Sequence, residues 1–280
     1  MWKIQPVSVN LGNQDMGLFA GAADKVNRLW KSYKKLREAA SISNHFAKYL
    51  APKVATSKEL QQEVFKIRHN VYCDELAFEP VKPDGLEVDE FDAFSVHCLI
   101  QHIATEAYAG TIRLVTPREE GQLLPIEKYC ADAIEHPEFT PDKLDRTQIC
   151  ELSRLAVPEQ FRRRKFDTHP GAATGVINEE IYSETELRCF PFIAIGLYMS
   201  AASIAFKMGI NHAFVMMEPR LARSMGFIGI KFIKIGPTIE YHGQRAPYYI
   251  NAELLMKSLS PSFRMMLKDI KNTINKQLPS

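Results

Sequence analysis

From residue 46 to the C-terminus, stretches with the apolar patterns of strands and helices alternate, and this alternation restricts the fold more than any other feature of the sequence. We expect strands at 46–50, 95–103, 107–115, 147–157, 212–217, 231–235 and 248–252. We expect helices at 58–75, after Ser57 as N-cap, at about 190–206, at 219–224 and at the C-terminus. Strands that alternate with helices predict one mixed α/β (α+β) domain over residues 46–280.

Residues 1–45 are predicted to form a separate N-terminal extension. Within it, 22–40 has apolar side chains at helical spacing and lysines and arginines over the remaining surface, which predicts a basic amphipathic helix. Such a helix either packs its apolar stripe on its own domain or docks on an acidic protein or an anionic membrane. Both interpretations stay open on the sequence alone.

Composition and charge bear on several classes of function. With 35 Lys and Arg against 33 Asp and Glu, the formal charge is +2, so nothing in the net charge indicates binding to nucleic acid. The five cysteines, an odd number without a C-x-x-C pair, argue against a disulfide framework and for a reducing compartment. The N-terminus lacks the apolar run of a signal peptide, so we expect a cytoplasmic protein.

The uncharged stretch 190–206 is just short of the roughly 20 residues that span a bilayer. Pro191, Gly196, Ser200 and Ser203 dilute its apolar character. We therefore expect a helix buried inside the domain. Contact with a membrane, including a peripheral one, is the alternative.

Charged residues interrupt apolar segments at positions where burial is costly. Arg113 lies in an Ile-Arg-Leu strand, Glu151 is in the middle of another strand, and Arg68 is on a helix. Because an isolated buried charge is destabilising, these groups need partners. We expect Asp89 and Asp92 to pair with Arg68 and Arg113, and Glu151 to pair with one of the arginines. A purely structural network of ion pairs fits the same spacing.

Two charged turns suggest different ligands. The acidic turn at 87–92 lacks the D-x-D-x-D-G pattern of a calcium loop, so we expect no bound metal. Arg162, Arg163 and Arg164 follow a strand, where guanidinium groups beside free backbone N–H groups suit a phosphate or pyrophosphate. A solvated basic surface is the alternative.

Glu151 and Arg154 are three residues apart in one predicted strand. In a regular strand they point to opposite faces, because side chains alternate with a period of two. A β-bulge near Ser153 would bring both to one face and free backbone N–H groups from the ladder. Such N–H groups can bind an oxyanion, which an acyl-transfer site requires.

Taken in order, these clusters resemble a known family. Residues 67–72 match L/I-R-x-x-V/F-Y/F, 87–92 match E-x-D-x-x-D, 110–114 match G-T-x-R-L, and 151–157 match E-L/I-S-R-x-A-V. The set resembles the acyl-homoserine-lactone synthases and long-chain N-acyl amino acid synthases, autoinducer-synthase-like members of the GNAT acyltransferase superfamily, over about residues 46–255. The segment 68–79 is closer still to the acyltransferases associated with the PEP-CTERM/exosortase system.

The resemblance implies a GNAT-like mixed central sheet flanked by helices, and it assigns a site. The residues that it places around the acceptor and the reacting thioester are Arg68, Tyr72, Asp89, Asp92, Arg113, Glu151 and Arg154. Arg162, Arg163 and Arg164 stand where the phosphopantetheine-binding turn should be, and Tyr72 is the further residue expected to contact the donor.

Departures from the family pattern narrow the substrates. The Gly-rich coenzyme A motif Q/R-x-x-G-x-G/A is absent after the arginines, which favours an acyl carrier protein over coenzyme A as the donor. Phe78 stands where the lactone synthases have tryptophan, and 168–186 is an insertion. An amino acid or a similar small amine is therefore expected as the acceptor, rather than S-adenosylmethionine.

We therefore expect an N-acyltransferase that moves a fatty acyl group from an acyl carrier protein to a small amine, without a tightly bound cofactor. Glu151 would take a proton from the amine, and backbone N–H groups would stabilise the oxyanion. Because no cysteine has a motif-supported histidine partner, direct transfer is favoured over an acyl-enzyme. The alternatives are an acyl-homoserine-lactone synthase and a non-catalytic module that binds acyl carrier or lipid.

Overall fold

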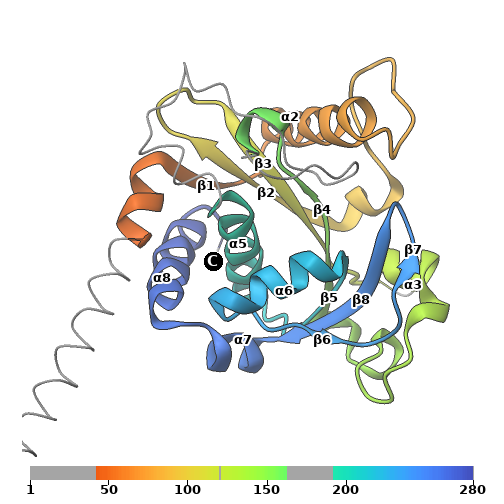
Figure 1. Cartoon of the computed structure of the whole chain (residues 1–280). Helices are drawn as coiled ribbons and strands as arrows, with labels where there is room; N and C mark the ends of the chain where they lie inside the picture. Colours follow the sequence, from red (N-terminus) through yellow and green to blue (C-terminus); the bar gives the residue numbers. More distant parts are fainter. Residues whose placement is uncertain (1–41, 120, 163–191, 280) are drawn as a thin grey trace, which may run out of the picture.

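The computed structural model describes residues 42–119, 121–162 and 192–279, which build one mixed sheet with helices on both faces (Figure 1). The sheet has eight strands in the order β1-β2-β3-β4-β5-β8-β6, with β7 paired to β8. The pair β4–β5 is parallel and all the other pairs are antiparallel. The strands are β1 Leu50–Val54, β2 Ser95–His102, β3 Tyr108–Val115, β4 Ile149–Ala156, β5 His212–Met217, β6 Ile233–Lys234, β7 Ile239–Glu240 and β8 Gln244–Asn251.

Alternating side chains of β2 face two different helices. Leu99 packs in a cluster with Val64 of α2, whereas Cys98 and Ile100 pack in the larger cluster that contains α5. Because successive side chains of a strand point to opposite faces, α2 and α5 cover opposite faces of the sheet. Besides the helical residues 42–49, the described α-helices are α2 Lys58–His69, α3 Pro125–Tyr129, α5 Phe192–Lys207, α6 Pro219–Ile228, α7 Ala252–Ser258 and α8 Pro261–Asn275.

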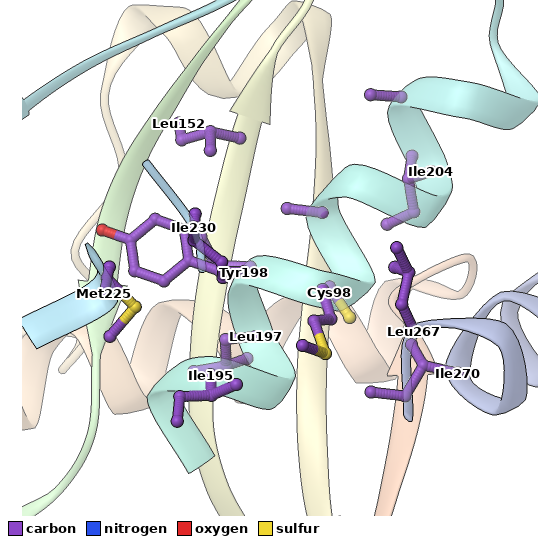
Figure 2. Packing of buried hydrophobic residues seen from close by; sticks show 14 of the residues in the cluster. Cys98, Leu152, Ile195, Leu197, Tyr198, Ile204, Met225, Ile230, Leu267 and Ile270 are labelled. Atoms are coloured by element: carbon purple, nitrogen blue, oxygen red, sulfur yellow. The ribbon is translucent and has the colours of Figure 1, made fainter. Parts of the chain in front are cut away.

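The helix α5 is buried on nearly all sides, as its uncharged sequence predicted. Figure 2 shows its side chains packed between β2 at Cys98, α8 at Leu267 and α6 at Met225. The hydroxyl groups of Ser200 and Ser203 donate to carbonyl oxygens one turn earlier in the same helix, so the apolar surroundings leave neither unsatisfied. Among the described residues, no helix combines the length and the apolar character that crossing a membrane requires.

The predicted strands after residue 90 and the helix after Ser57 are confirmed. The Ser57 side chain accepts a hydrogen bond from the Leu60 N–H as an N-cap, and the last part of the predicted helix, Asn70–Glu75, is a π-helical turn. The helix predicted at 219–224 continues to Ile228, and β6 is shorter than expected.

The strand predicted at 46–50 is wrong. Residues 42–49 are helical and β1 begins at Leu50. Phe46 is buried against α5 at Gly196, where a Cβ atom would lie 2.6 Å from the Phe46 ring. The helix therefore depends on a long-range contact that a short apolar run cannot reveal. The helix at 42–49 also spans the boundary predicted at residue 45. The helix predicted at 22–40 lies outside the described residues, so a separate N-terminal extension stays a prediction.

Replacing Gly229 by alanine should lower the free energy of unfolding by about 2–4 kcal/mol. Gly229 ends α6 in the left-handed region with φ +96°, and an added Cβ would overlap the Ser258 carbonyl oxygen. The control is Gly226→Ala inside α6, where a Cβ meets nothing within 4 Å; it should be neutral or stabilise by up to about 1 kcal/mol. Urea unfolding measures both, and equal stabilities for the two variants would contradict this account.

Candidate active site

The sheet opens where β4 and β5 separate. Their parallel pairing runs only from Ile149–His212 to Glu151–Phe214. Beyond that point, residues 152–155 of β4 and 215–217 of β5 line a cavity of about 550 Å³. The strands thus form a gap in the middle of the sheet rather than at its edge.

A bulge in β4 turns its residues toward this cavity. The register with β3 passes from Arg113–Ser153 to Thr111–Ala156, and Arg154 has φ 50°. The Tyr72 hydroxyl donates to the carbonyl oxygen of Leu155, 2.8 Å away, within the irregular stretch. Arg154 and Leu155 therefore lack register partners in β3, and both Glu151 and Arg154 line the cavity. The bulge predicted near Ser153 is confirmed.

The predicted pairing of two aspartates with two arginines is confirmed. Arg68 donates from Nη1 to Asp92 at 2.6 Å and from Nε to Glu87 at 2.5 Å. Arg113 donates from Nη1 to Asp89 at 2.5 Å and to Asp92 at 2.9 Å. Although burial opposes ionisation of Asp92, the hydrogen bond and charge of Arg68, with the charge of Arg113, hold its pKa well below its ordinary value. Asp92 is therefore ionised at neutral pH.

Asp89 and Asp92 also shape the chain that carries them. Each accepts a backbone hydrogen bond in a capping box, Asp89 from the Phe91 N–H and Asp92 from the Asp89 N–H, at the start of the 3₁₀ helix Glu90–Phe94. This local structure explains why the two carboxylates come from one short acidic turn. It presents both of them to Arg113 on β3.

Arg154 pairs with Asp89, which the sequence assigned to the site, and with two carboxylates that it did not assign, Glu79 and Glu87. Its Nη2 atom lies 2.9 Å from Glu79, 3.0 Å from Glu87 and 3.3 Å from Asp89. Glu87 thereby joins Arg68 to Arg154 and is 3% exposed. Its place as the first residue of the E-x-D-x-x-D motif is the sequence feature that could have assigned Glu87 to the site.

Glu151 differs from the other carboxylates. Its Oε2 atom accepts a hydrogen bond from the Ile126 N–H at 2.7 Å, and no Lys, Arg or His of the described chain lies within 4.0 Å of it, so the predicted ion pair is wrong. Burial raises its pKa to about 8, against the opposing effects of the Ile126 hydrogen bond and of the Arg113 charge. A carboxyl group with this pKa can exchange a proton near neutral pH.

The basic turn is only partly described. Arg162 is buried and forms an ion pair with Glu75, and it is not among the residues that line the cavity. Arg163 and Arg164 lie outside the described residues. The expected role of this turn in binding a donor phosphate stays a prediction, and it now rests on Arg163 and Arg164.

A hairpin that the sequence did not link to the site covers part of the cavity. Tyr241 and His242, from the turn between β7 and β8, and Arg245 of β8 line it together with Phe78. The rings of Phe78 and His242 are 5.5 Å apart, and the Arg245 guanidinium lies 5.9 Å from the Phe78 centroid. The turn residues His242-Gly243, between two short extended runs, are the sequence feature that could have predicted this hairpin.

The described cysteines lack the properties of nucleophiles. Cys73, Cys98, Cys130 and Cys150 are buried free thiols. Burial raises the pKa of Cys98 and of Cys150 to about 12, and the pKa of Cys130 to about 11. Thiols of this kind are almost entirely protonated at neutral pH. The described residues also include no group of three or more His, Cys, Asp or Glu side chains that could hold a metal ion.

Residues 67–169 match the family described as acetyltransferase (GNAT) domain. An acyl-homoserine-lactone synthase from Aeromonas salmonicida is 29% identical over 125 residues, which are 45% of this chain and 56% of that protein. The chain therefore matches a little over half the length of this relative.

Two solved structures have the same fold. TofI, in a ternary complex with an inhibitor and MTA, has a TM-score of 0.52 and 15% identity, and the match covers 74% of this chain and 96% of TofI. BjaI, a CoA-dependent acyl-homoserine lactone synthase with MTA, has a TM-score of 0.50 and 17% identity over 83% of this chain and 90% of BjaI. The predicted GNAT-like fold and the resemblance to the autoinducer-synthase-like group are confirmed. The closer likeness to PEP-CTERM/exosortase acyltransferases stays a prediction.

Proposed function

We propose that this chain, with its GNAT domain match and the fold of the lactone synthases, is an N-acyltransferase that moves a fatty acyl group from the thioester of an acyl carrier protein to the amine of an amino acid or similar small acceptor. One observation carries the proposal. The buried carboxyl of Glu151, with a pKa of about 8, lies in a cavity beside a bulged strand, where the sheet opens. This combination provides a proton acceptor and free backbone donors in one place.

The proposed reaction is direct aminolysis of a thioester. The phosphopantetheine arm enters the gap between β4 and β5, and backbone N–H groups near Arg154 stabilise the oxyanion. Glu151 takes the proton of the attacking amine, the nitrogen forms a bond to the acyl carbon, and the carbon–sulfur bond breaks. The proton passes to the departing thiolate, so the products are an amide and a free thiol. The raised pKa of the described cysteines favours this route over an acyl-enzyme.

The network of ion pairs has a supporting role in this proposal. Arg113 contacts Asp89 and Asp92, and its Nε atom donates to the Ser153 hydroxyl at 3.0 Å, directly before the bulge. Arg154, inside the bulge, is held by Glu79 and Glu87. The cluster therefore fixes the start of the irregular stretch, which keeps the backbone donors at a constant distance from the thioester.

The decisive experiment supplies the purified full chain with palmitoyl-acyl carrier protein and, in separate reactions, amino acids or S-adenosylmethionine. Mass spectrometry of the products distinguishes the candidates. Acyl amino acids support the proposal, and acyl lactones identify a homoserine-lactone synthase. The absence of both, with the thioester intact, indicates a module that binds without catalysis. A product that depends on a PEP-CTERM/exosortase component would support that further link.

Charge reversal of Arg163 and Arg164 together should raise the apparent KM for the acyl carrier protein about 10-fold and leave the KM for the acceptor within about 2-fold. The reason is that carrier proteins present the pantetheine arm from an acidic surface. The rate should also lose its dependence on salt. Charge reversal of Lys268 and Lys276, both exposed on or beside α8 and away from the cavity, is the control. An unchanged carrier KM would refute the assignment of this turn.

A further inference from the structure

Arg245 lies at the start of β8, opposite Ile239 of β7, and lines the large cavity. Its guanidinium is placed over the ring of Phe78, 5.9 Å from the centroid. The Nε atom is buried and has no hydrogen-bond partner. A buried N–H without an acceptor is destabilising, so its retention indicates a partner that the protein itself does not supply.

The other arginines of this cavity differ from Arg245 in their partners. Arg113 and Arg154 each lie within 3.3 Å of at least two carboxylates. Arg245 has no carboxylate oxygen within 4.0 Å among the residues that the structure describes, and this includes Glu218, which follows the paired residue Met217 of β5. The cavity thus holds one guanidinium whose charge is not matched by an adjacent acid.

We propose that Arg245 binds the carboxylate of the acceptor, so that the acceptor is an amino acid with a free carboxyl group rather than a neutral amine; this inference rests on the proposed acyl transfer. A guanidinium presents its N–H groups as a planar fork that matches a carboxylate. The unsatisfied Nε atom of Arg245 is one arm of that fork. The Phe78 ring below the guanidinium contributes a cation–π contact that favours this position of the group.

Arg245 and Glu151 face the same space although they come from different strands, β8 and β4. Both residues line one cavity. A small molecule there can therefore place its carboxylate at Arg245 and its amine toward Glu151.

The donor is a poorer match for Arg245. The thioester end of a phosphopantetheine arm, which must reach the bulge of β4, carries no charge, and the phosphate is at the far end of the arm. The sequence places other arginines, Arg163 and Arg164, after β4 for that phosphate. An anion binding beside Phe78 and His242 is accordingly assigned to the acceptor.

The test compares amino acids with their carboxamides as acceptors. Glycine, alanine, leucine, phenylalanine and ornithine are each paired with the matching carboxamide, and kcat/KM is measured with palmitoyl-acyl carrier protein for the wild type, Arg245→Met and Arg245→Lys. The amine of a carboxamide is the less basic of each pair, so without recognition of the carboxylate it should react at least as well. The wild type should prefer the amino acid. Arg245→Met should lower kcat/KM for the amino acid by about 10–100-fold, whereas its kcat/KM for the carboxamide should stay within about 3-fold of the wild-type value.

Arg245→Lys should recover part of the preference, since it keeps the charge and loses the fork. Arg118→Met, an exposed arginine away from the cavity, is the matched control and should leave both acceptors unchanged. Equal use of amino acids and carboxamides by the wild type, or an unaltered preference in folded Arg245→Met, would overturn this inference and leave acyl transfer standing. No product from any acceptor in the wild type would overturn the proposed function, and this inference with it.

Discussion

Replacing Glu151 by glutamine should lower kcat for acyl transfer by roughly 10²-fold or more, because the amide keeps the shape of the side chain but cannot accept the proton of the amine. In the wild type the rate should rise with pH through about 8, where Glu151 becomes ionised. The deficit of the variant should shrink at higher pH, where the acceptor amine is already neutral. Steady-state kinetics from pH 6 to pH 10 measure both effects.

The same substitution has an opposite effect on stability. Burial raises the pKa of Glu151 from its ordinary 4.5 to about 8, so the folded protein binds this proton more tightly than the unfolded chain. The stabilisation is fully present below pH 4.5 and is lost as the pH rises through about 8. At pH 9 the glutamine variant should therefore be more stable than the wild type, by about 2–5 kcal/mol. A single variant that gains stability while it loses activity separates chemistry from folding.

Glu127→Gln is the control for both measurements. Glu127 is a partly buried glutamate next to Ile126 in the chain. It accepts a hydrogen bond from the Leu124 N–H and pairs with Arg146, but it does not line the cavity. Its kcat should remain within about 2-fold of the wild type. A Glu151→Gln enzyme that works at the full rate would leave Glu151 as a purely structural residue.

The parts of the site that could be predicted are those in which a charged side chain lies within an apolar segment of the sequence. An arginine between Ile112 and Leu114 requires acids nearby, and the acidic turn was the available source. A pair of charges three residues apart on one strand requires a bulge if both reach one cavity, and the structure has it. Each inference needed only local spacing and the energetic penalty of burying a charge.

The parts that could not be predicted depend on partners without a distinctive sequence. Glu151 is held by the backbone N–H of Ile126, and any residue type except proline has such a group. Phe78 and Arg245 meet only after β8 has paired with β5 across the sheet. The short apolar run around Phe46 resembles a strand. Its burial in a helix depends on the absence of a side chain at Gly196, which is far away in the sequence. Strand register and the close packing of helices depend on the tertiary structure, so they are difficult to predict from a single sequence.

Replacing Arg113 by alanine should abolish measurable acyl transfer and lower the free energy of unfolding by about 3–5 kcal/mol. Asp92 is nearly buried and loses one of its two arginine partners, while Asp89 loses the guanidinium that lies 2.5 Å away. The hydrogen bond to Ser153 at the edge of the bulge is lost as well. Urea unfolding and product formation by mass spectrometry are the two measurements.

Arg113→Lys separates the two roles of this side chain. It keeps the positive charge and loses the planar group that reaches Ser153 and both aspartates, so it should recover most of the stability but only part of the rate. The stability difference between the wild type and Arg113→Ala should shrink in acid. The charges of Arg68 and Arg113 lower the pKa of Asp92, so the stability that they confer is present above pH 3.8 and is lost as the pH falls below it. If Arg113→Lys is as stable as the wild type and equally active, then charge alone is required; if Arg113→Ala is fully active, the cluster has no part in fixing the bulge.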